Sequence, residues 1–321
     1  MEKRKIVVTG ANGQLGRELQ AIAGARSTEG QPASLIDRAW TIADFMATDV
    51  EILLFPFEFL FLSKEDLPIQ DAARTLQFFE RHRPDYCINC AAYTAVDKAE
   101  SEKDLAFAIN GDAVGSLAAA CKRVGARLIH ISTDYVFDGH SDIPLKENDP
   151  TGPINIYGAS KLKGEQLARQ ENPDTVIIRT SWVYSEFGNN FVKTMMRLMR
   201  EKERISVVDD QIGSPTYAAD LAAVIGRIVS GGIFVPGLYH YSNEGQISWF
   251  DFAQAIKEGI HSSCTVVPIP TAQYPTPAKR PKYSLLDSNL IKATYGITIP
   301  EWRQSLTRCL AKIASPGSSG H

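Results

Sequence analysis

The sequence has few cysteines, no long apolar run and little net charge, and each shortage excludes a class of protein. Five cysteines in 321 residues are an odd number in a long chain, which excludes a disulfide framework. Cys87 and Cys90 have CxxC spacing, but their apolar surroundings predict a strand, in which residues three apart point to opposite faces. No second Cys or His pair completes a zinc site, so we predict no metal ligands.

The most apolar stretch, residues 51–62, is too short to span a bilayer and contains Pro56 and two glutamates. No apolar signal segment follows the first residues, so we expect a cytoplasmic protein with no membrane partner. The net charge of −3 gives no reason to expect nucleic acid as a partner. With 44% hydrophobic and 22% charged residues, the composition is that of an ordinary globular protein.

Apolar, often β-branched runs alternate with helix-forming segments over the first 180 residues. Strands are predicted at 5–9, 57–62, 86–90, 127–132 and 176–180, and helices at 71–83, at 106–124 and from Tyr157 onward. This alternation predicts an α/β fold, a Rossmann-like doubly wound parallel sheet over residues 1–180 with an unusual insertion at about 26–56. Residues 181–314 predict a smaller C-terminal α/β domain, and 315–321 a disordered tail.

Three glycines, Gly10, Gly13 and Gly16, follow the first predicted strand and precede helix-forming residues. A strand, a glycine turn and a helix form the arrangement that binds dinucleotides. Glycines let the backbone approach a pyrophosphate, and the helix N-terminus offers free N–H groups to it. The alternative is a glycine-rich turn without a ligand.

A dinucleotide site also needs an acid about 20 residues past the last glycine, to bind the ribose 2′-hydroxyl. Asp37 lies 21 positions after Gly16, but the residues around it make a weak strand. The better strand, 57–62, ends at Ser63 and Lys64. No carboxylate then meets the 2′-hydroxyl, and Lys64 favours a 2′-phosphate, so NADPH and NADH both stay open.

Tyr157 and Lys161 lie four positions apart, so on a helix they project from the same face. An ammonium one turn away is expected to lower the pKa of the Tyr157 phenol and make it a general acid or base. Thr133 sits at the end of a predicted strand, where catalytic groups of such sheets lie. The alternative is a half-buried tyrosine beside a solvated lysine. His130, inside that strand, is predicted to be a packed core histidine.

A proline-rich loop at 270–281 carries two cations, Lys279 and Arg280. Its four prolines are expected to prevent regular structure there. A rigid basic loop suits a diphosphate or an acidic surface, and a solvated loop is the alternative.

Eight stretches in order resemble one family, the dTDP-4-dehydrorhamnose reductases of the extended short-chain dehydrogenase/reductase superfamily. They cover residues 10–16, 89–100, 132–139, 157–165, 179–184, 188–195, 210–216 and 275–281. The resemblance implies hydride transfer from NADPH or NADH to C4 of dTDP-4-dehydro-L-rhamnose, which gives dTDP-L-rhamnose. In that reaction Tyr157 protonates the forming alkoxide, Lys161 holds the nicotinamide ribose, and Thr133 hydrogen-bonds the carbonyl oxygen.

The same resemblance implies contacts for the cofactor and for the dTDP-sugar. Together with Ser63 and Lys64, which come from the strand prediction above and not from the resemblance, the predicted cofactor contacts are Gly10, Asn12, Gly13, Gln14, Leu15, Gly16, Pro68, Ile69, Ala91, Ala92, Tyr93, Thr94, Tyr157 and Lys161. The substrate contacts are Val96, Thr133, Asp134, Trp182, Lys279 and Arg280.

The chain departs from the family at the adenosine end, where Ser63 and Pro68 stand in places that often hold an acid. Some members use Mg²⁺ for dimerisation; a homodimer stays open here, and no residue can be assigned to the metal. Two alternatives also stay open. One is a non-enzymatic, NADP-binding regulatory subunit of the methionine adenosyltransferase type. The other is a reductase or epimerase of another nucleotide sugar.

Overall fold

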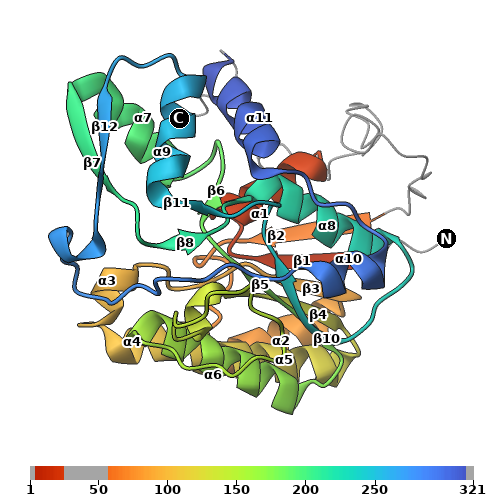
Figure 1. The fold of residues 1–321 in the computed structure, drawn as a ribbon. Coiled ribbons are helices and arrows are strands. Elements are labelled where there is room, and N and C mark those ends of the chain that lie inside the picture. The colour runs from red at the N-terminus through yellow and green to blue at the C-terminus, as the bar shows by residue number, and fades with distance from the viewer. Residues whose placement is uncertain (1–3, 25–56, 316–321) are drawn as a thin grey trace.

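A six-stranded, wholly parallel sheet forms the centre of the molecule (Figure 1). The computed structural model describes residues 4–24 and 57–315. Across the sheet, the order is β10 (Gly237–Tyr241), β5 (Thr175–Thr180), β4 (Arg127–Thr133), β3 (Tyr86–Asn89), β1 (Arg4–Thr9) and β2 (Phe57–Leu62). The central strands read as apolar, β-branched runs because helices cover both of their faces. The predicted doubly wound α/β fold is confirmed.

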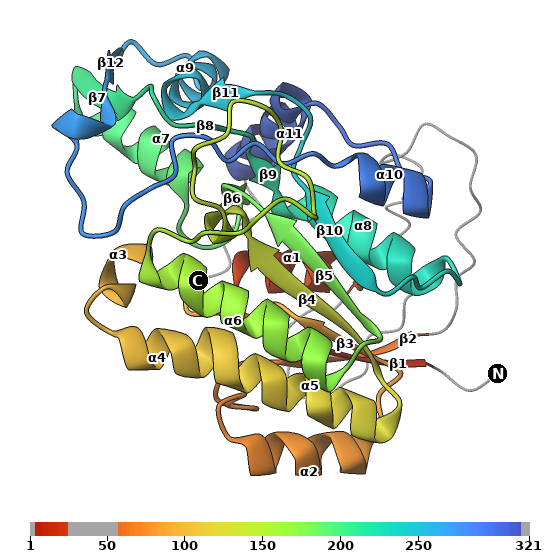
Figure 2. The same ribbon diagram turned by 60° about the horizontal axis from the view of Figure 1, so that its bottom comes forward.

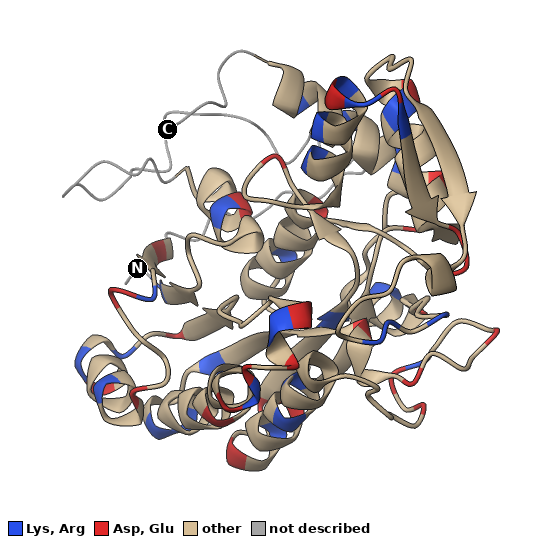
Figure 3. Ribbon diagram, turned by 90° about the vertical axis from the view of Figure 1, so that its left-hand side faces the viewer, with Lys and Arg blue, Asp and Glu red and all other residues tan. Residues whose placement is uncertain are grey.

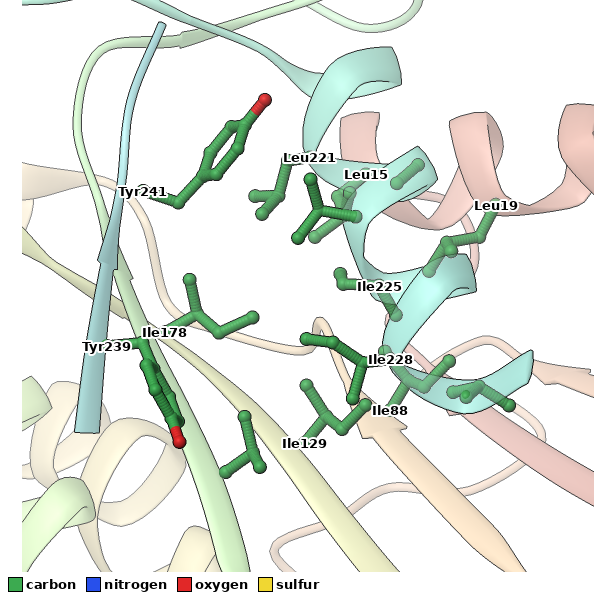
Figure 4. Packing of buried hydrophobic residues seen from close by; sticks show 14 of the residues in the cluster. Leu15, Leu19, Ile88, Ile129, Ile178, Leu221, Ile225, Ile228, Tyr239 and Tyr241 are labelled. Carbon is green, nitrogen blue, oxygen red and sulfur yellow. The ribbon is translucent and has the colours of Figure 1, made fainter. Parts of the chain in front are cut away.

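Helices cover the two faces of the sheet in separate layers. Figures 1 and 2 show three of them side by side on one face: α2 (Ala72–His82), α5 (Ala113–Val124) and α6 (Ile156–Glu171). The other face is covered by α1 (Gln14–Ile22) and α8 (Ala218–Ser230). Figure 4 shows the core between α1, α8 and the sheet, where Leu15 and Ile225 meet Ile129 and Ile178. Burial of such side chains contributes about 1.5–3 kcal/mol each.

A second core lies beyond the carboxyl end of the sheet. It is built from α7 (Phe191–Glu201), α9 (Trp249–Gly259) and α11 (Trp302–Ala314), together with the parallel pair β7 (Arg204–Val208) and β12 (Thr265–Ile269). Smaller elements complete the chain: α3 (Val96–Ala99), α4 (Lys103–Phe107), β6 (Val183–Tyr184), β8 (Ile212–Gly213), β9 (Thr216–Tyr217), β11 (Ile247–Ser248) and α10 (Asn289–Tyr295). Acidic and basic residues are interspersed along the helices and turns of the described chain (Figure 3).

Several predicted elements differ from the observed ones. The predicted helix at 106–124 begins earlier, as α4, and passes through a π-helical turn at Ala108–Asp112 before α5. The loop predicted at 270–281 contains a single 3₁₀ turn, Thr271–Gln273, because its prolines lie on either side of these residues. The predicted insertion and residues 316–321 of the predicted tail lie outside the described residues.

The chain returns to the central sheet after residue 180. β10 pairs with β5 as the sixth strand, and α8 packs beside α1. The division into 1–180 and 181–314 stays a prediction, and the sheet draws on both parts of the chain.

A buried pair of carboxyl groups joins α1 to the elements of the second core. Glu18 is 1% exposed, and the Ser185 hydroxyl donates to its Oε1 at 2.6 Å. Tyr217 and Lys312 donate to the Glu186 carboxylate at 2.9 and 3.0 Å. Burial, with the hydrogen bond and charge of Glu186, raises the pKa of Glu18 to about 8. Burial opposes ionisation of Glu186 as well, but the hydrogen bond from Glu18 and the charge of Lys312 hold its pKa below the usual value. Glu18 therefore stays protonated and donates a hydrogen bond to the Glu186 carboxylate.

This pair predicts a pH-dependent stability. Folded protein holds the Glu18 proton up to about pH 8, whereas the unfolded chain loses it above about 4.5. The free energy of unfolding therefore falls as the pH rises between these values, by at most about 1.4 kcal/mol per pH unit. In Glu18→Gln this fall should be reduced, which urea unfolding at acidic and mildly alkaline pH would measure. The same substitution at exposed Glu203 controls for the loss of one carboxylate, and equal falls in Glu18→Gln and unsubstituted protein would contradict the assignment.

Candidate active site

One face of α6 carries three polar side chains at four-residue spacing: Tyr157, Lys161 and Glu165. The helix begins after Asn155, whose side chain accepts from the Gly158 N–H at 2.7 Å. Lys161 is 2% exposed, and its Nζ donates to the Ile131 carbonyl of β4 at 2.6 Å. The face is therefore turned toward the carboxyl half of β4, where the sequence places the catalytic groups.

Tyr157 and Thr133 meet at the carboxyl end of β4. The half-buried Tyr157 phenol is hydrogen-bonded with the Thr133 hydroxyl, which also donates to Asp134 Oδ1 at 3.0 Å. The Tyr135 ring meets the Tyr157 ring edge-on, with centroids 5.7 Å apart. The three predicted catalytic residues thus come from two adjacent elements, with Tyr157 against Thr133 and Lys161 one turn further along α6.

The expected lowering of the Tyr157 pKa by Lys161 is wrong for this structure. Burial raises the pKa of Tyr157 to about 12, although the hydrogen bond with Thr133 lowers it. Burial also lowers the pKa of Lys161 to about 8, against the opposing charge of Glu165. Desolvation thus outweighs the Thr133 hydrogen bond at Tyr157 and the charge of Glu165 at Lys161. Tyr157 holds its proton at neutral pH, which suits a group that must donate one.

A buried ion pair fixes the inner half of α6 to the sheet. The Arg179 guanidinium of β5 donates to both oxygens of Glu165 at 2.9 and 2.7 Å, and the Ser132 hydroxyl donates to Oε1 at 2.5 Å. Removing one partner of such a buried pair costs about 3–5 kcal/mol. The three residues lie in stretches that carry the family resemblance, but the sequence does not predict their pairing, because it depends on the register of α6 against β4 and β5.

Asn110, a second residue that sequence reasoning missed, lies fully buried in the π-helical turn. Its side chain accepts from the Tyr93 N–H at 2.8 Å and donates to the Tyr93 carbonyl and to Ser160 Oγ, both at 3.0 Å. Ser160 in turn donates to the Tyr157 carbonyl at 2.8 Å. Asn110 therefore links the strand edge at 91–94 to the first turn of α6. The only sign of Asn110 in the sequence is an amide within a segment predicted to be an apolar helix. The π-helical turn that holds it, a feature that often marks functional sites, appears only in the folded chain.

The glycine turn between β1 and α1 is closely packed on its own backbone. Gly10 has φ +69°, and a Cβ there would lie 2.5 Å from the Ala91 nitrogen. A Cβ on Gly16 would overlap the Gly10 and Ala11 carbonyls, while Gly13 donates its N–H to the Gly10 carbonyl at 3.0 Å. Gly13 is the N-cap of α1 and provides no side-chain hydrogen bond, and no acidic residue lies in the first turn. The first N–H groups of α1 thus remain available to an anion.

Other residues of this turn have distinct surroundings. Asn12 is exposed, whereas the Leu15 side chain is buried in the core, so only its backbone can face a ligand. Gln14 accepts from Asn190 Nδ2 at 2.9 Å and donates to the Val183 carbonyl at 3.4 Å. Gln14 therefore connects the glycine turn to the segment that leads into α7.

At the predicted adenosine end, β2 runs beside β1 and ends just before Ser63. The Ser63 hydroxyl accepts from the N–H groups of Glu65 and Asp66, and its own N–H donates to Asp66 Oδ2 at 2.8 Å. Lys64 is exposed, with Glu65 at 3.6 Å. Two acids thus lie beside the predicted phosphate cation, and neither was foreseen.

The remaining predicted adenosine contacts are unequally accessible: Ile69 is 5% exposed and Pro68 is half-buried. Asp37 lies outside the described residues.

The segment after β3 is only partly covered by the rest of the chain. Ala91, Ala92 and Tyr93 are half-buried and Thr94 is exposed. The Tyr93 hydroxyl donates to Glu102 at 2.6 Å. This edge lies beside Gly10, so the glycine turn and the 91–94 segment meet at the same end of the sheet.

The predicted basic loop is tied to α3 by an ion pair. Arg280 donates from two nitrogens to both oxygens of Asp97 at 2.7 and 2.8 Å, which lowers the pKa of Asp97. Lys279 is exposed, and its carbonyl accepts from Asn155 Nδ2 at 2.8 Å. Val96, the first residue of α3, is half-buried beside Asp97. The loop therefore lies against the start of α6, although Asp97 balances the charge of Arg280.

Trp182 follows the carboxyl end of β5, and its indole stacks on that of Trp249 with ring centroids 3.7 Å apart. Asp134 is 3% exposed, and burial raises its pKa to about 6. Trp182 lies two positions after Thr180, the β5 residue that pairs with Thr133 at the end of β4.

Within residues 4–24 and 57–315, no group of three or more His, Cys, Asp or Glu side chains could hold a metal ion. In the same part of the chain, no helix has the length and apolar character needed to cross a membrane.

His130 is fully buried, with its Nδ1 3.0 Å from Asn89 Nδ2, and burial lowers its pKa. The prediction that this histidine is packed in the core is confirmed.

Comparisons with known proteins agree on one family. The model described as "RmlD substrate binding domain" matches residues 4–315. The chain is 38% identical to the dTDP-4-dehydrorhamnose reductase of Burkholderia thailandensis, over 97% of this chain and 99% of that protein. The crystal structure of the Clostridium acetobutylicum enzyme has a TM-score of 0.85 at 38% identity, covering 97% and 100% of the two chains. That of Bacillus anthracis dTDP-4-dehydrorhamnose reductase in complex with NADP has a TM-score of 0.84 at 39% identity and the same coverage.

Proposed function

Because the chain belongs to the dTDP-4-dehydrorhamnose reductase family, we propose that it performs the last step of dTDP-L-rhamnose synthesis. In that step the C4 keto group of dTDP-4-dehydro-L-rhamnose is reduced with NAD(P)H. The observation that carries the proposal is the meeting of Tyr157 and Thr133 at the end of the sheet that also holds the glycine turn.

The residues present fit a dinucleotide. The side-chain-free backbone of Gly10, Gly13 and Gly16 and the uncapped start of α1 suit a pyrophosphate. The 91–94 segment and Lys161 lie along the same carboxyl edge, where Lys161 would hold the nicotinamide ribose. When bound, the reduced cofactor supplies the hydride.

Side chains of the protein supply the proton for the reduction and stabilise the negative charge that forms on the carbonyl oxygen. Thr133 presents a hydroxyl to the carbonyl oxygen of the sugar, on which negative charge forms. Tyr157, protonated at neutral pH, donates its proton to that oxygen as the alkoxide develops. The charge left on the phenolate faces the Thr133 hydroxyl, and Lys161 lies one turn away. Asp134 and Trp182 are the proposed sugar contacts, and Val96, Lys279 and Arg280 are proposed around the diphosphate.

Turnover tests the proposal directly. Purified protein should oxidise NADPH or NADH only when dTDP-4-dehydro-L-rhamnose is added, with dTDP-L-rhamnose as the product. A panel of other 4-keto nucleotide sugars serves as the specificity control. Failure to turn over the dTDP substrate with either cofactor would defeat the proposal.

NADPH is the proposed cofactor, because β2 ends in Ser63 and Lys64 rather than in an acid. A carboxylate at this position would bind a ribose 2′-hydroxyl and repel a 2′-phosphate. The relative solved with NADP lends support. Glu65 and Asp66 lie close by, so the expected preference is moderate.

Ser63→Asp should reverse this preference. An aspartate can accept the same turn hydrogen bonds, so the local fold should persist. We expect KM for NADPH to rise about tenfold, as one repulsive contact of about 1.4 kcal/mol requires, while KM for NADH falls. The readout is kcat/KM for both cofactors, and Glu65→Gln is the control for a change of one charge. An unchanged ratio of the two values would disprove the role of Ser63.

A further inference from the structure

The backbone of Trp182 has a conformation that aromatic residues seldom adopt. Its φ is +48°, in the left-handed region that favours glycine. The segment is fixed on both sides: Ser181 Oγ donates to the Ser214 carbonyl at 2.6 Å, and the Thr216 N–H donates to the Trp182 carbonyl at 3.4 Å. Such strain persists only where the surroundings enforce it, and it clusters at functional sites.

The Trp182 side chain is held as firmly as its backbone. Its indole lies nearly parallel to that of Trp249, with an interplanar angle of 14°. Trp249 is the first residue of α9, and the Ser248 capping box fixes this end of the helix. The Phe191 ring packs against the Trp249 ring, with centroids 4.6 Å apart. On another side, a Cβ on Gly213 would lie 2.9 Å from Cζ2 of Trp182.

Both indoles remain half-buried, although they pack against the second core. The pair therefore presents apolar aromatic surface at the carboxyl end of the sheet instead of closing into the interior. Aromatic faces suit the C–H face of a sugar ring and the methyl group of a 6-deoxyhexose, since both are apolar. Rigid support of such a surface reduces the entropy lost when a ligand binds.

We propose that Trp249 is a positioning residue for the sugar: its ring fixes the Trp182 indole at the angle that contacts the 6-deoxyhexose, and Gly213 is small to admit that indole. This inference rests on the proposed function, which supplies Trp182 as a sugar contact. Trp249 acts on sugar binding through Trp182. Hydride transfer and cofactor binding belong to the other groups of the site.

The test compares Trp249→Ala and Trp249→Phe by calorimetric titration with dTDP-L-rhamnose and with dTDP. In Trp249→Ala the Kd for dTDP-L-rhamnose should rise about tenfold, the effect of losing one aromatic contact, while the Kd for dTDP stays unchanged. Trp249→Phe, which keeps a stacking ring, should restore most of the affinity. In turnover, KM for the sugar nucleotide should rise with the Kd, while kcat and KM for NADPH stay within about threefold.

Phe250→Ala is the matched control, because it removes a neighbouring half-buried aromatic from the same turn of α9. An equal loss in this variant, an equal loss for dTDP, or unchanged binding in Trp249→Ala would each overturn the proposal. Thermal unfolding of each variant separates loss of binding from loss of the fold. Tight binding of dTDP-L-rhamnose without turnover would defeat the proposed reaction. The titrations would still decide whether Trp249 positions Trp182 for sugar binding.

Discussion

Tyr157→Phe is expected to lower kcat by between about 100-fold and 10,000-fold, the usual contribution of a general acid. The substitution removes only the hydroxyl that lies against Thr133, while the ring keeps its edge contact with Tyr135. The burial that raises the pKa of Tyr157 to about 12 keeps its proton in place for the reduction. Binding of cofactor and substrate should change little, so kcat carries the loss. Single-turnover rates with NADPH and dTDP-4-dehydro-L-rhamnose would measure it.

Tyr135→Phe is the matched control for this result. Tyr135 is a second phenol beside the first, and its hydroxyl is hydrogen-bonded with the Arg280 guanidinium. We expect its kcat to stay within about threefold of the unsubstituted enzyme. A Tyr157→Phe variant with nearly full turnover, or an equal loss in both variants, would show that the proton comes from elsewhere.

Gly158→Ala should disable the site without changing any reacting group. A Cβ on Gly158 would overlap the Tyr135 carbonyl, so the first turn of α6 must move away from residues 134–136. Tyr157 precedes the substituted residue, and its distance from Thr133 would grow. Overpacking of this kind costs about 1–3 kcal/mol of stability, and a displacement of about 1 Å can lower turnover 100-fold. Urea unfolding and kcat together measure both effects.

Gly226→Ala provides the comparison, because a Cβ in this part of α8 meets no atom within 4 Å. This variant should gain about 0.5–1 kcal/mol in stability from helix propensity and keep full activity. If Gly158→Ala resembled Gly226→Ala in both readouts, close contact at the start of α6 could not be what positions Tyr157.

The parts of the fold that depend on local sequence could be predicted. The run at 57–62 predicted β2 with its observed bounds, and the glycine turn after β1 was placed between the correct strand and helix. Tyr157 falls in the first turn of α6, as expected, because a loop rich in Pro, Gly and Asn precedes it. Apolar periodicity and turn residues carry this information without reference to distant contacts.

Features that depend on distant partners could not be predicted. The short run at 237–241 could pair with many strands, and only the folded chain shows that it extends the central sheet beside β5. The sequence predicts Arg280 as a cation for a diphosphate, whereas in the folded chain it pairs with Asp97, 183 positions away in sequence. The four-residue spacing of Tyr157 and Lys161 predicts a lowered pKa for Tyr157. The desolvation that raises this pKa depends on packing, so it appears only in the folded structure.

Transfer of deuterium tests the central claim most directly. The enzyme would be supplied with dTDP-4-dehydro-L-rhamnose and with NADPH in which both hydrogens at C4 of the nicotinamide are replaced by deuterium, and the product would be analysed by NMR. The account predicts dTDP-L-rhamnose with deuterium bound to C4 of the sugar, formed at a rate that falls sharply in Tyr157→Phe. Reduced sugar without deuterium at C4, or NADPH that stays unoxidised beside an intact keto sugar, would contradict it.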